Sequence, residues 1–167
     1  MAGLDLTNLS PADAVAALRS YPRRFRAVLV PLAEDPTVAD RLARVGPDGR
    51  SALDITADVA RTIVLLDGAL AQALVHDDAV LHPAVTDAAA RHWDGAPADL
   101  DGTLVLLDDG CAAMADRAEQ ASSAAWYRTS AVAGADQPIE TFDLLREAVR
   151  VGGDGLRAVE RTLAAVR

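Results

Sequence analysis

The stretch SALDITADVARTIVLLDGALAQA, residues 51–73, decides the fold. Its apolar face recurs at intervals of three and four residues, at Thr56, Val59, Ile63, Leu66, Leu70 and Ala73. This spacing keeps the six positions on one side of an α-helix, which has about 3.6 residues per turn. Gly46-Pro47-Asp48-Gly49 predicts a turn just before the stretch, and Ser51 can cap the helix that follows. We therefore predict a long helix that packs in a bundle.

Another helix is predicted on the N-terminal side of this stretch. Ser10 can cap it, and Pro11 suits the first helical position, where a missing backbone N–H leaves no bond unmade. Apolar residues continue at helical spacing, at Val15, Leu18, Phe25, Val28 and Leu29. Pro22 lacks the amide that an interior helical residue donates, so we expect a kink or break near Tyr21.

Two further helices are predicted, over residues 100–122 and from Pro138 to the C-terminus. Their apolar stripes are Leu104, Leu107, Cys111, Met114, Ala118 and Ala121, and Phe142, Leu145, Val149, Gly152, Leu156, Val159, Leu163 and Val166. Residues 78–100 form a long connection, with room for a short helix over 85–93. No segment alternates with a period of two, so no sheet is expected. The sequence predicts an all-α four-helix bundle with a long connection between its second and third helices.

Composition narrows the class of protein. The 167 residues, of which 51% are hydrophobic, predict a single folded domain over residues 1–167. All 16 basic residues are arginine, and 25 acidic residues give a net charge of −9. Such a chain repels phosphate backbones and anionic lipids, so we expect no nucleic-acid and no membrane partner. One cysteine and an N-terminus without a signal-peptide pattern favour the cytoplasm. The lysine-free, alanine-rich composition indicates an actinobacterial source.

Few side chains offer ready catalytic chemistry. The three histidines, His76, His82 and His92, lie at or beyond the end of the second predicted helix, and no motif surrounds them. Cys111 lies on an apolar stripe, where a buried thiol is normally inert, so we expect it to pack in the core.

Glycines and tryptophans are the other unusual residues. Gly152, Gly153 and Gly155 each cost a helix interior about 1 kcal/mol relative to alanine. Close contact with a neighbouring helix is the favoured explanation, and a functional hinge is the alternative. Trp126 is expected to seal one end of the bundle, and Trp93 to pack, with a pocket or a subunit contact as its alternatives.

Two segments resemble motifs of the DinB-like superfamily. The stretch 51–59, SALDITADV, is similar to the family's Ser-x-x-Glu-x-x-x-His-Val pattern, with Asp58 at the position of the histidine. The stretch 145–159, LREAVRVGGDGLRAV, is similar to His-Asp-x-x-His-His-Leu-x-Asp-Val, with Arg150, Asp154 and Gly155 at the three histidines. The segments Trp126-Tyr127-Arg128-Thr129 and Val75-His76-Asp77-Asp78 resemble two shorter elements of the family. The resemblance covers nearly the whole chain.

The resemblance implies a four-helix bundle in which one residue of the second helix and two of the fourth bind a divalent metal, often zinc or nickel. Members of the family include mycothiol- and bacillithiol-dependent transferases and isomerases. This chain departs from that pattern, because an arginine, which stays protonated, cannot ligate a metal. The substitutions at Asp58, Arg150 and Asp154 therefore predict that the histidine metal site has been lost.

Three interpretations of Asp58, Arg150 and Asp154 are open. They can form ordinary surface ion pairs, since helical geometry places each of them about 100° or more from its apolar stripe. They can form a salt-bridge cluster where the metal once lay, if Asp58 and Asp154 face each other and Arg150 neutralises them. They can also offer carboxylates, from Asp58 and Asp154, to a hard cation such as Mg²⁺ or Mn²⁺.

The function predicted from the sequence is that of a non-catalytic binding or structural bundle, without cofactor, that forms a homodimer through its helix faces. The alternative is a thiol transferase, isomerase or hydrolase that depends on a divalent cation or on a carboxylate base. A small-molecule ligand is compatible with either function, and the sequence does not identify one.

Overall fold

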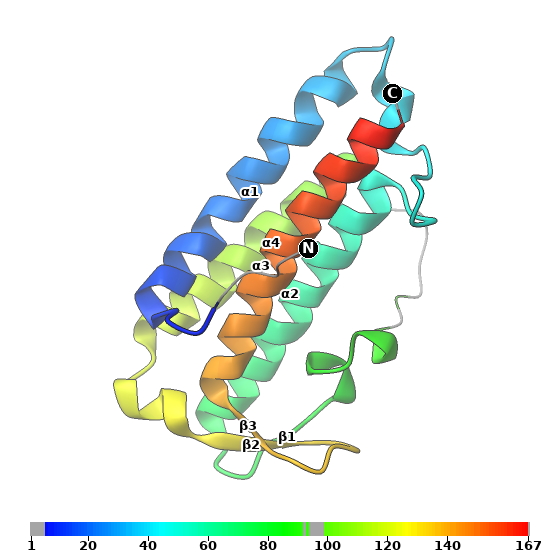
Figure 1. Ribbon diagram of the computed structural model, residues 1–167. Coiled ribbons are helices and arrows are strands. Elements are labelled where there is room, and N and C mark those ends of the chain that lie inside the picture. The colour runs from blue at the N-terminus through cyan, green and yellow to red at the C-terminus, as the bar shows by residue number, and fades with distance from the viewer. Residues whose placement is uncertain (1–5, 92, 94–98, 167) are drawn as a thin grey trace.

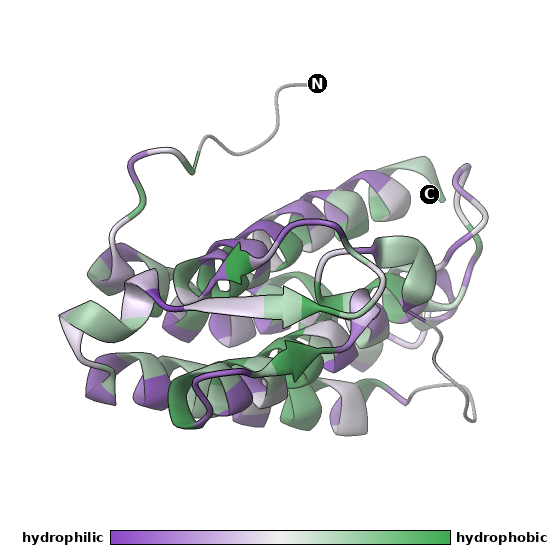
Figure 2. Cartoon of the chain, turned by 90° about the horizontal axis from the view of Figure 1, so that it is seen from below, coloured by the Kyte–Doolittle hydropathy of each residue, from purple (hydrophilic) through white to green (hydrophobic). Residues whose placement is uncertain are grey.

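The computed structural model describes residues 6–91, 93 and 99–166, and it is built on four long helices (Figure 1). These are α1 (Pro11–Glu34), α2 (Ala52–Val75), α3 (Leu100–Gln120) and α4 (Thr141–Ala165). The predicted all-α four-helix bundle is therefore confirmed. Figure 2 shows hydrophobic residues concentrated on the inner sides of the helices.

The helices are connected in an order that places α2 and α3 side by side and in the same direction (Figure 1). Because parallel neighbours cannot be joined by a tight turn, the chain must run back along the bundle between them. The connection from α2 to α3, which we call the crossover and of which residues 76–91, 93 and 99 are described, does this. The crossover contains β1 (Val80–Leu81) and two short 3₁₀ turns, η2 (Pro83–Val85) and η3 (Ala88–Ala90). The two turns replace the short helix that we predicted over residues 85–93.

Capping side chains fix where α1 and α2 begin. The Ser51 hydroxyl accepts a hydrogen bond from the Asp54 amide (3.1 Å), and the Asp54 carboxylate accepts one from the Ser51 amide (3.1 Å). Ser10 and Asp13 form the same reciprocal pair at the start of α1. These bonds satisfy amides that the first helical turn leaves without partners. Both predicted caps are confirmed.

The expectation that the chain has no sheet is wrong. Three short strands, β1, β2 (Thr129–Val132) and β3 (Ile139–Glu140), lie together across one end of the bundle (Figure 2). β2 pairs in parallel with β1 and antiparallel with β3. Strands of two to four residues are too short to show an alternating pattern. The pairing of β3 also explains why α4 begins at Thr141 and not, as predicted, at Pro138.

Of the predicted kink or break near Tyr21, the break is wrong, because α1 runs without interruption through Pro22. Leu18, Tyr21 and Phe25, which flank the proline, are all buried in the core. Packing of this face holds the helix together although Pro22 cannot donate a backbone hydrogen bond.

Two glycines of α4 allow its closest contacts with other helices. A Cβ atom at Gly152 would lie 2.4 Å from the Tyr21 ring of α1, and one at Gly155 would lie 2.2 Å from a Val59 methyl of α2. Both distances are far below van der Waals contact, so no larger residue fits without displacement. The interpretation of the glycines as sites of close helix contact is confirmed for these two positions.

Single bulky or reactive side chains complete the core as expected. Trp126 is buried and packs edge-on against Phe142, with the ring centroids 5.8 Å apart. Cys111 is fully buried, and desolvation raises the pKa of its thiol to about 12, with a smaller contribution from Asp108. The thiol is therefore neutral near pH 7 and does not act as a nucleophile in the folded protein.

Candidate functional site

Asp58 lies on the side of α2 that faces the crossover. Its Oδ1 atom accepts a hydrogen bond from the indole Nε1 of Trp93 (2.5 Å), and its Oδ2 atom lies 3.2 Å from Nη2 of Arg50. Trp93 therefore packs through a specific polar contact, which the sequence did not indicate. Both carboxylate oxygens of Asp58 are already engaged by donors of this chain.

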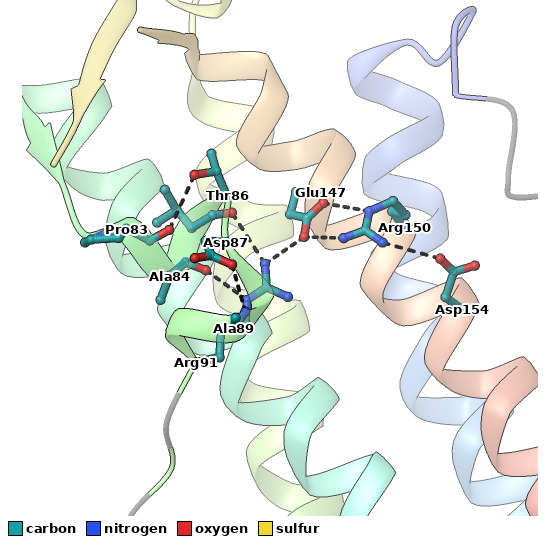
Figure 3. A network of polar contacts seen from close by, with 10 residues as sticks. Pro83, Ala84, Thr86, Asp87, Ala89, Arg91, Glu147, Arg150 and Asp154 are labelled. Carbon is teal, nitrogen blue, oxygen red and sulfur yellow. Dashed lines mark hydrogen bonds and ion pairs between the residues drawn. The ribbon is translucent and has the colours of Figure 1, made fainter. Parts of the chain in front are cut away.

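Arg150 and Asp154 lie one turn apart on α4 and form part of a longer chain of charges (Figure 3). Nε and Nη2 of Arg150 donate to the Glu147 carboxylate at 2.7 and 2.6 Å, while Nη1 lies 3.6 Å from Asp154. Asp154 also accepts a hydrogen bond from Arg157. The bonds to Glu147 raise the pKa of Arg150 above its ordinary value, so this guanidinium stays charged.

Glu147 is the functional candidate that sequence reasoning missed. Nη2 of Arg91, from the crossover, donates to Glu147 Oε1 at 2.7 Å, and the two side chains are only 8% and 17% exposed. Nε of Arg91 also donates to the carbonyl oxygen of Ala84 (2.8 Å). Helical periodicity places Glu147 nearly opposite the apolar stripe of α4, where a charged residue is expected to be in water. The crossover covers the Glu147 side chain, and no pattern in the sequence of α4 predicts this burial.

The structure therefore separates the three predicted residues into two groups. Among the contacts of the described residues, none joins Asp58 to Arg150 or Asp154. The crossover contacts both groups, through Trp93 to Asp58 on α2 and through Arg91 to Glu147 on α4. It thus ties the two helices together along their shared face.

The donor set on this face does not fit a divalent metal centre. Within the ranges 6–91, 93 and 99–166, no three side chains of histidine, cysteine, aspartate or glutamate converge. A zinc site needs three or four such ligands, and a magnesium site needs carboxylates free to coordinate it. Here the carboxylates of Asp58, Glu147 and Asp154 are held by arginines or by an indole N–H.

His76 and His82 do not add ligands to this site. His76 is exposed and ends α2. His82 accepts a hydrogen bond from the Ala84 amide through Nδ1 (3.1 Å), so it caps η2. His92 lies outside the described residues.

A hollow of about 550 Å³ adjoins the charged face of α4. The segment before α1 forms one wall, through Leu6 and Thr7, and α4 supplies Asp143, Arg146, Glu147 and Arg150. Its size is within the range of about 300–1,000 Å³ that small-molecule sites usually have. Its charges balance, with two guanidinium groups and two carboxylates.

The helix order and the long crossover define a four-helix bundle in which the neighbours α2 and α3 run parallel, and a four-helix bundle is the fold that the sequence resemblance implied. The structure of YfiT from Bacillus subtilis has this fold and superposes with a TM-score of 0.76, at 13% sequence identity, over 97% of this chain and 90% of YfiT. YfiT is described as a probable metal-dependent hydrolase with an unusual four-helix bundle topology. No protein-family model and no curated protein matches the sequence. The likeness to YfiT establishes the fold.

Proposed function

We propose that this protein is a DinB-like bundle whose histidine metal centre has been replaced by salt bridges, and that it acts as a non-catalytic binding or structural protein. One observation carries the proposal. Arg91 and Arg150 hold Glu147 from two sides, so a guanidinium from the crossover neutralises a carboxylate on the face between α2 and α4. Because the Arg91 guanidinium already neutralises the Glu147 carboxylate, this face needs no bound metal ion to balance that charge.

The placement of the predicted residues supports the same proposal. Of their three interpretations, it keeps the first for Asp58, which forms an ion pair of its own. It keeps only part of the second, because the salt bridges of Arg150 and Asp154 on α4 do not include Asp58. The third interpretation requires Asp58 and Asp154 to share one cation. Each of them is instead engaged by a different arginine, Arg50 or Arg157.

Metal analysis tests this proposal. Protein purified without a polyhistidine tag is analysed by inductively coupled plasma mass spectrometry and titrated with Zn²⁺, Mn²⁺ and Mg²⁺ in a calorimeter. We expect far less than one divalent ion per chain, and no saturable site that Asp58→Asn or Asp154→Asn removes. Asp109→Asn, a change at an exposed carboxylate of α3, is the matched control. One bound metal per chain that both site variants release, and the control retains, overturns the proposal.

The fold likeness to YfiT favours one alternative, a metal- or carboxylate-dependent enzyme. Under it, Asp58 or Asp154 acts as a general base or cation ligand in hydrolysis, thiol transfer or isomerisation. Ester and amide hydrolysis and thiol-transfer assays, with and without added Mn²⁺, distinguish the two functions. Turnover that Asp58→Asn or Asp154→Asn abolishes, in protein that remains folded, would establish the enzyme.

Within the described residues, no helix is both long and apolar enough to cross a membrane. The cytoplasmic location, the single domain over residues 1–167, the lack of a nucleic-acid partner and the actinobacterial source stay predictions. A fractionation of the source cells and a binding assay with DNA and RNA test the first and the third.

A further inference from the structure

The two edges of the small sheet differ in the backbone groups that they leave unpaired. β1 lies at one edge and β3 at the other. The edge of a sheet presents N–H and C=O groups with which a further strand can pair. At β3 this edge is closed, because Pro138 has no amide hydrogen and the Glu140 amide donates to the Asp143 carboxylate (3.1 Å).

The edge at β1 is open. The carbonyl oxygen of Ala79 accepts a hydrogen bond from the Ala131 amide of β2 (3.1 Å). That of Leu81 accepts one from the Ala133 amide (2.9 Å). Because successive residues of a strand direct their backbone groups to opposite sides, the N–H and C=O of Val80 point away from β2. Among the described residues no strand lies on that side of β1, and Val80 is 66% exposed. One more strand can therefore pair there.

A hollow of about 720 Å³ lies beside this edge. The last turn of α2, the turn that follows it and the start of β1 line the hollow, through Gln72, Val75, His76, Asp77, Asp78 and Val80. Val75, like Val80, is largely exposed. A strand added to β1 would lie in this hollow, and the two valines offer its apolar side chains a surface on which to pack.

The charge of the hollow selects the kind of strand. Arg128 donates to the Leu74 carbonyl oxygen (2.9 Å) and to the Asp77 carboxylate, so it balances the charge of Asp77. Asp78 has no ion pair with any residue that the structure describes. In addition, α2 ends beside Asp78 without a basic residue in its last turn. The Asp78 carboxylate and the negative end of the helix dipole both favour a cationic side chain here.

We propose that the open edge of β1 binds an extended segment of a partner protein, which adds a strand beside Val80 and places an arginine or lysine next to Asp78. In this mode of recognition, main-chain hydrogen bonds supply affinity and alternate side chains supply specificity. Because β1 has two residues, we expect weak and reversible binding. The site uses none of the residues at the metal positions, so it does not depend on the proposed loss of the metal centre.

A labelled peptide in which arginine and valine alternate is the probe, titrated against the full chain by fluorescence anisotropy. The control is the same peptide methylated on alternate backbone nitrogens, because it keeps the charge and side chains but loses the amides that would pair with β1. We expect saturable binding of the first peptide, one per chain. The methylated peptide should bind about 10-fold more weakly or worse, since edge groups of β1 are then left without partners.

Substitutions at the edge locate the binding. Val80→Pro removes an amide that faces the partner and leaves the bonds of Ala79 and Leu81 to β2 in place, so it should raise the dissociation constant about 10-fold. Val80→Thr keeps the amide and the branched shape, so it should bind as the wild type does. Asp78→Asn should weaken binding about threefold at low salt. Asp109→Asn, at an exposed carboxylate of α3, should not.

Circular dichroism verifies that each variant is folded, and the methylated peptide tests the proposal even if Val80→Pro does not fold. Equal binding of the methylated and unmethylated peptides would show charge attraction without an added strand and would overturn the proposal. A folded Val80→Pro that binds as the wild type does would also overturn it. So would the lack of saturable binding, or equal affinity for a peptide with glutamate in place of arginine.

Discussion

The inner and outer faces of α4 differ in what restricts their residues, which is close packing on the inner face and charge pairing on the outer face. On the inner face, Gly152 lies against the Tyr21 ring, and the shape of the contact leaves no space for even one added methyl group. On the outer face, Glu147 and Arg150 belong to a chain of charges in which all but the pair with Arg91 are partly in water. The comparison indicates that the burial of a side chain, more than its charge or polarity, sets how much the side chain contributes to the free energy of unfolding. The following changes test it, from the largest expected effect to the smallest.

Removal of the Glu147 carboxylate should have the largest effect. Glu147→Ala leaves the Arg91 guanidinium, which is 8% exposed, without its carboxylate partner, and should lower the free energy of unfolding by about 3 kcal/mol. Urea denaturation measures this difference. Glu160→Ala, at an exposed position of the same helix, is the control and should change stability by less than about 0.5 kcal/mol. Equal effects at the two positions would show that the crossover does not bury this ion pair.

A methyl group on the inner face should come next. Gly152→Ala forces the Tyr21 ring to move and should cost about 2 kcal/mol net, although alanine is the better helix former. Gly68→Ala, where the added methyl meets nothing within 4 Å, should instead stabilise the fold by about 1 kcal/mol. If thermal unfolding shows both changes to stabilise the protein, the close contact between α1 and α4 does not exist.

The Tyr21 hydroxyl should contribute less, and its contribution should depend on pH. The hydroxyl donates to the Val149 carbonyl oxygen (2.7 Å), so Tyr21→Phe should cost about 1 kcal/mol at pH 7. Burial raises the pKa of Tyr21 above its ordinary value of 10.0. Its contribution is therefore complete below pH 10 and is lost as the pH rises toward the raised pKa, because the unfolded chain ionises first.

Urea denaturation at several pH values from 7 to 11 measures this dependence. The wild type should lose more stability than Tyr21→Phe above pH 10. Tyr127→Phe, at a residue that is 77% exposed, should follow the wild type throughout. Parallel curves for wild type and Tyr21→Phe would contradict the buried hydrogen bond.

The exposed end of the charge chain should matter least. Arg150 and Asp154 are 47% and 42% exposed, so Arg150→Gln and Asp154→Asn should each change stability by less than about 0.5 kcal/mol. Glu147 keeps Arg91 as its partner in both variants. Added salt should reduce even these differences, because it screens charges that are in contact with water. A loss of more than 1 kcal/mol in a denaturation experiment would mean that this end of the network is buried too.

Local patterns predicted much of the fold. The spacing of apolar residues gave four helices, and the side chains of Ser10 and Ser51 marked where two of them begin. Helix periodicity and helix caps depend on residues within about one helical turn of each other, so both can be read from the sequence alone. The strands were not predicted, because β1 and β3 have two residues each and pair with residues that are distant in sequence. The continuity of α1 was not predicted, because packing around Pro22 stabilises the helix more than the loss of one backbone hydrogen bond destabilises it.

The candidate site was predicted less completely. The resemblance indicated Asp58, Arg150 and Asp154, and their charges indicated salt bridges. It did not indicate that Asp58 pairs with Arg50 and Trp93, since these contacts arise from the turn before α2 and from the crossover.

By itself, the sequence determined the class of fold, because apolar periodicity is a local property. The identity of its residues, with three histidines that are not in a metal-binding pattern, predicts that the histidine metal centre implied by the DinB-like resemblance has been lost. Only the tertiary structure decided which carboxylate is buried. Glu147 lies on the side of α4 that would face water in an isolated helix, and the crossover, returning along the bundle to join two parallel helices, brings Arg91 over it.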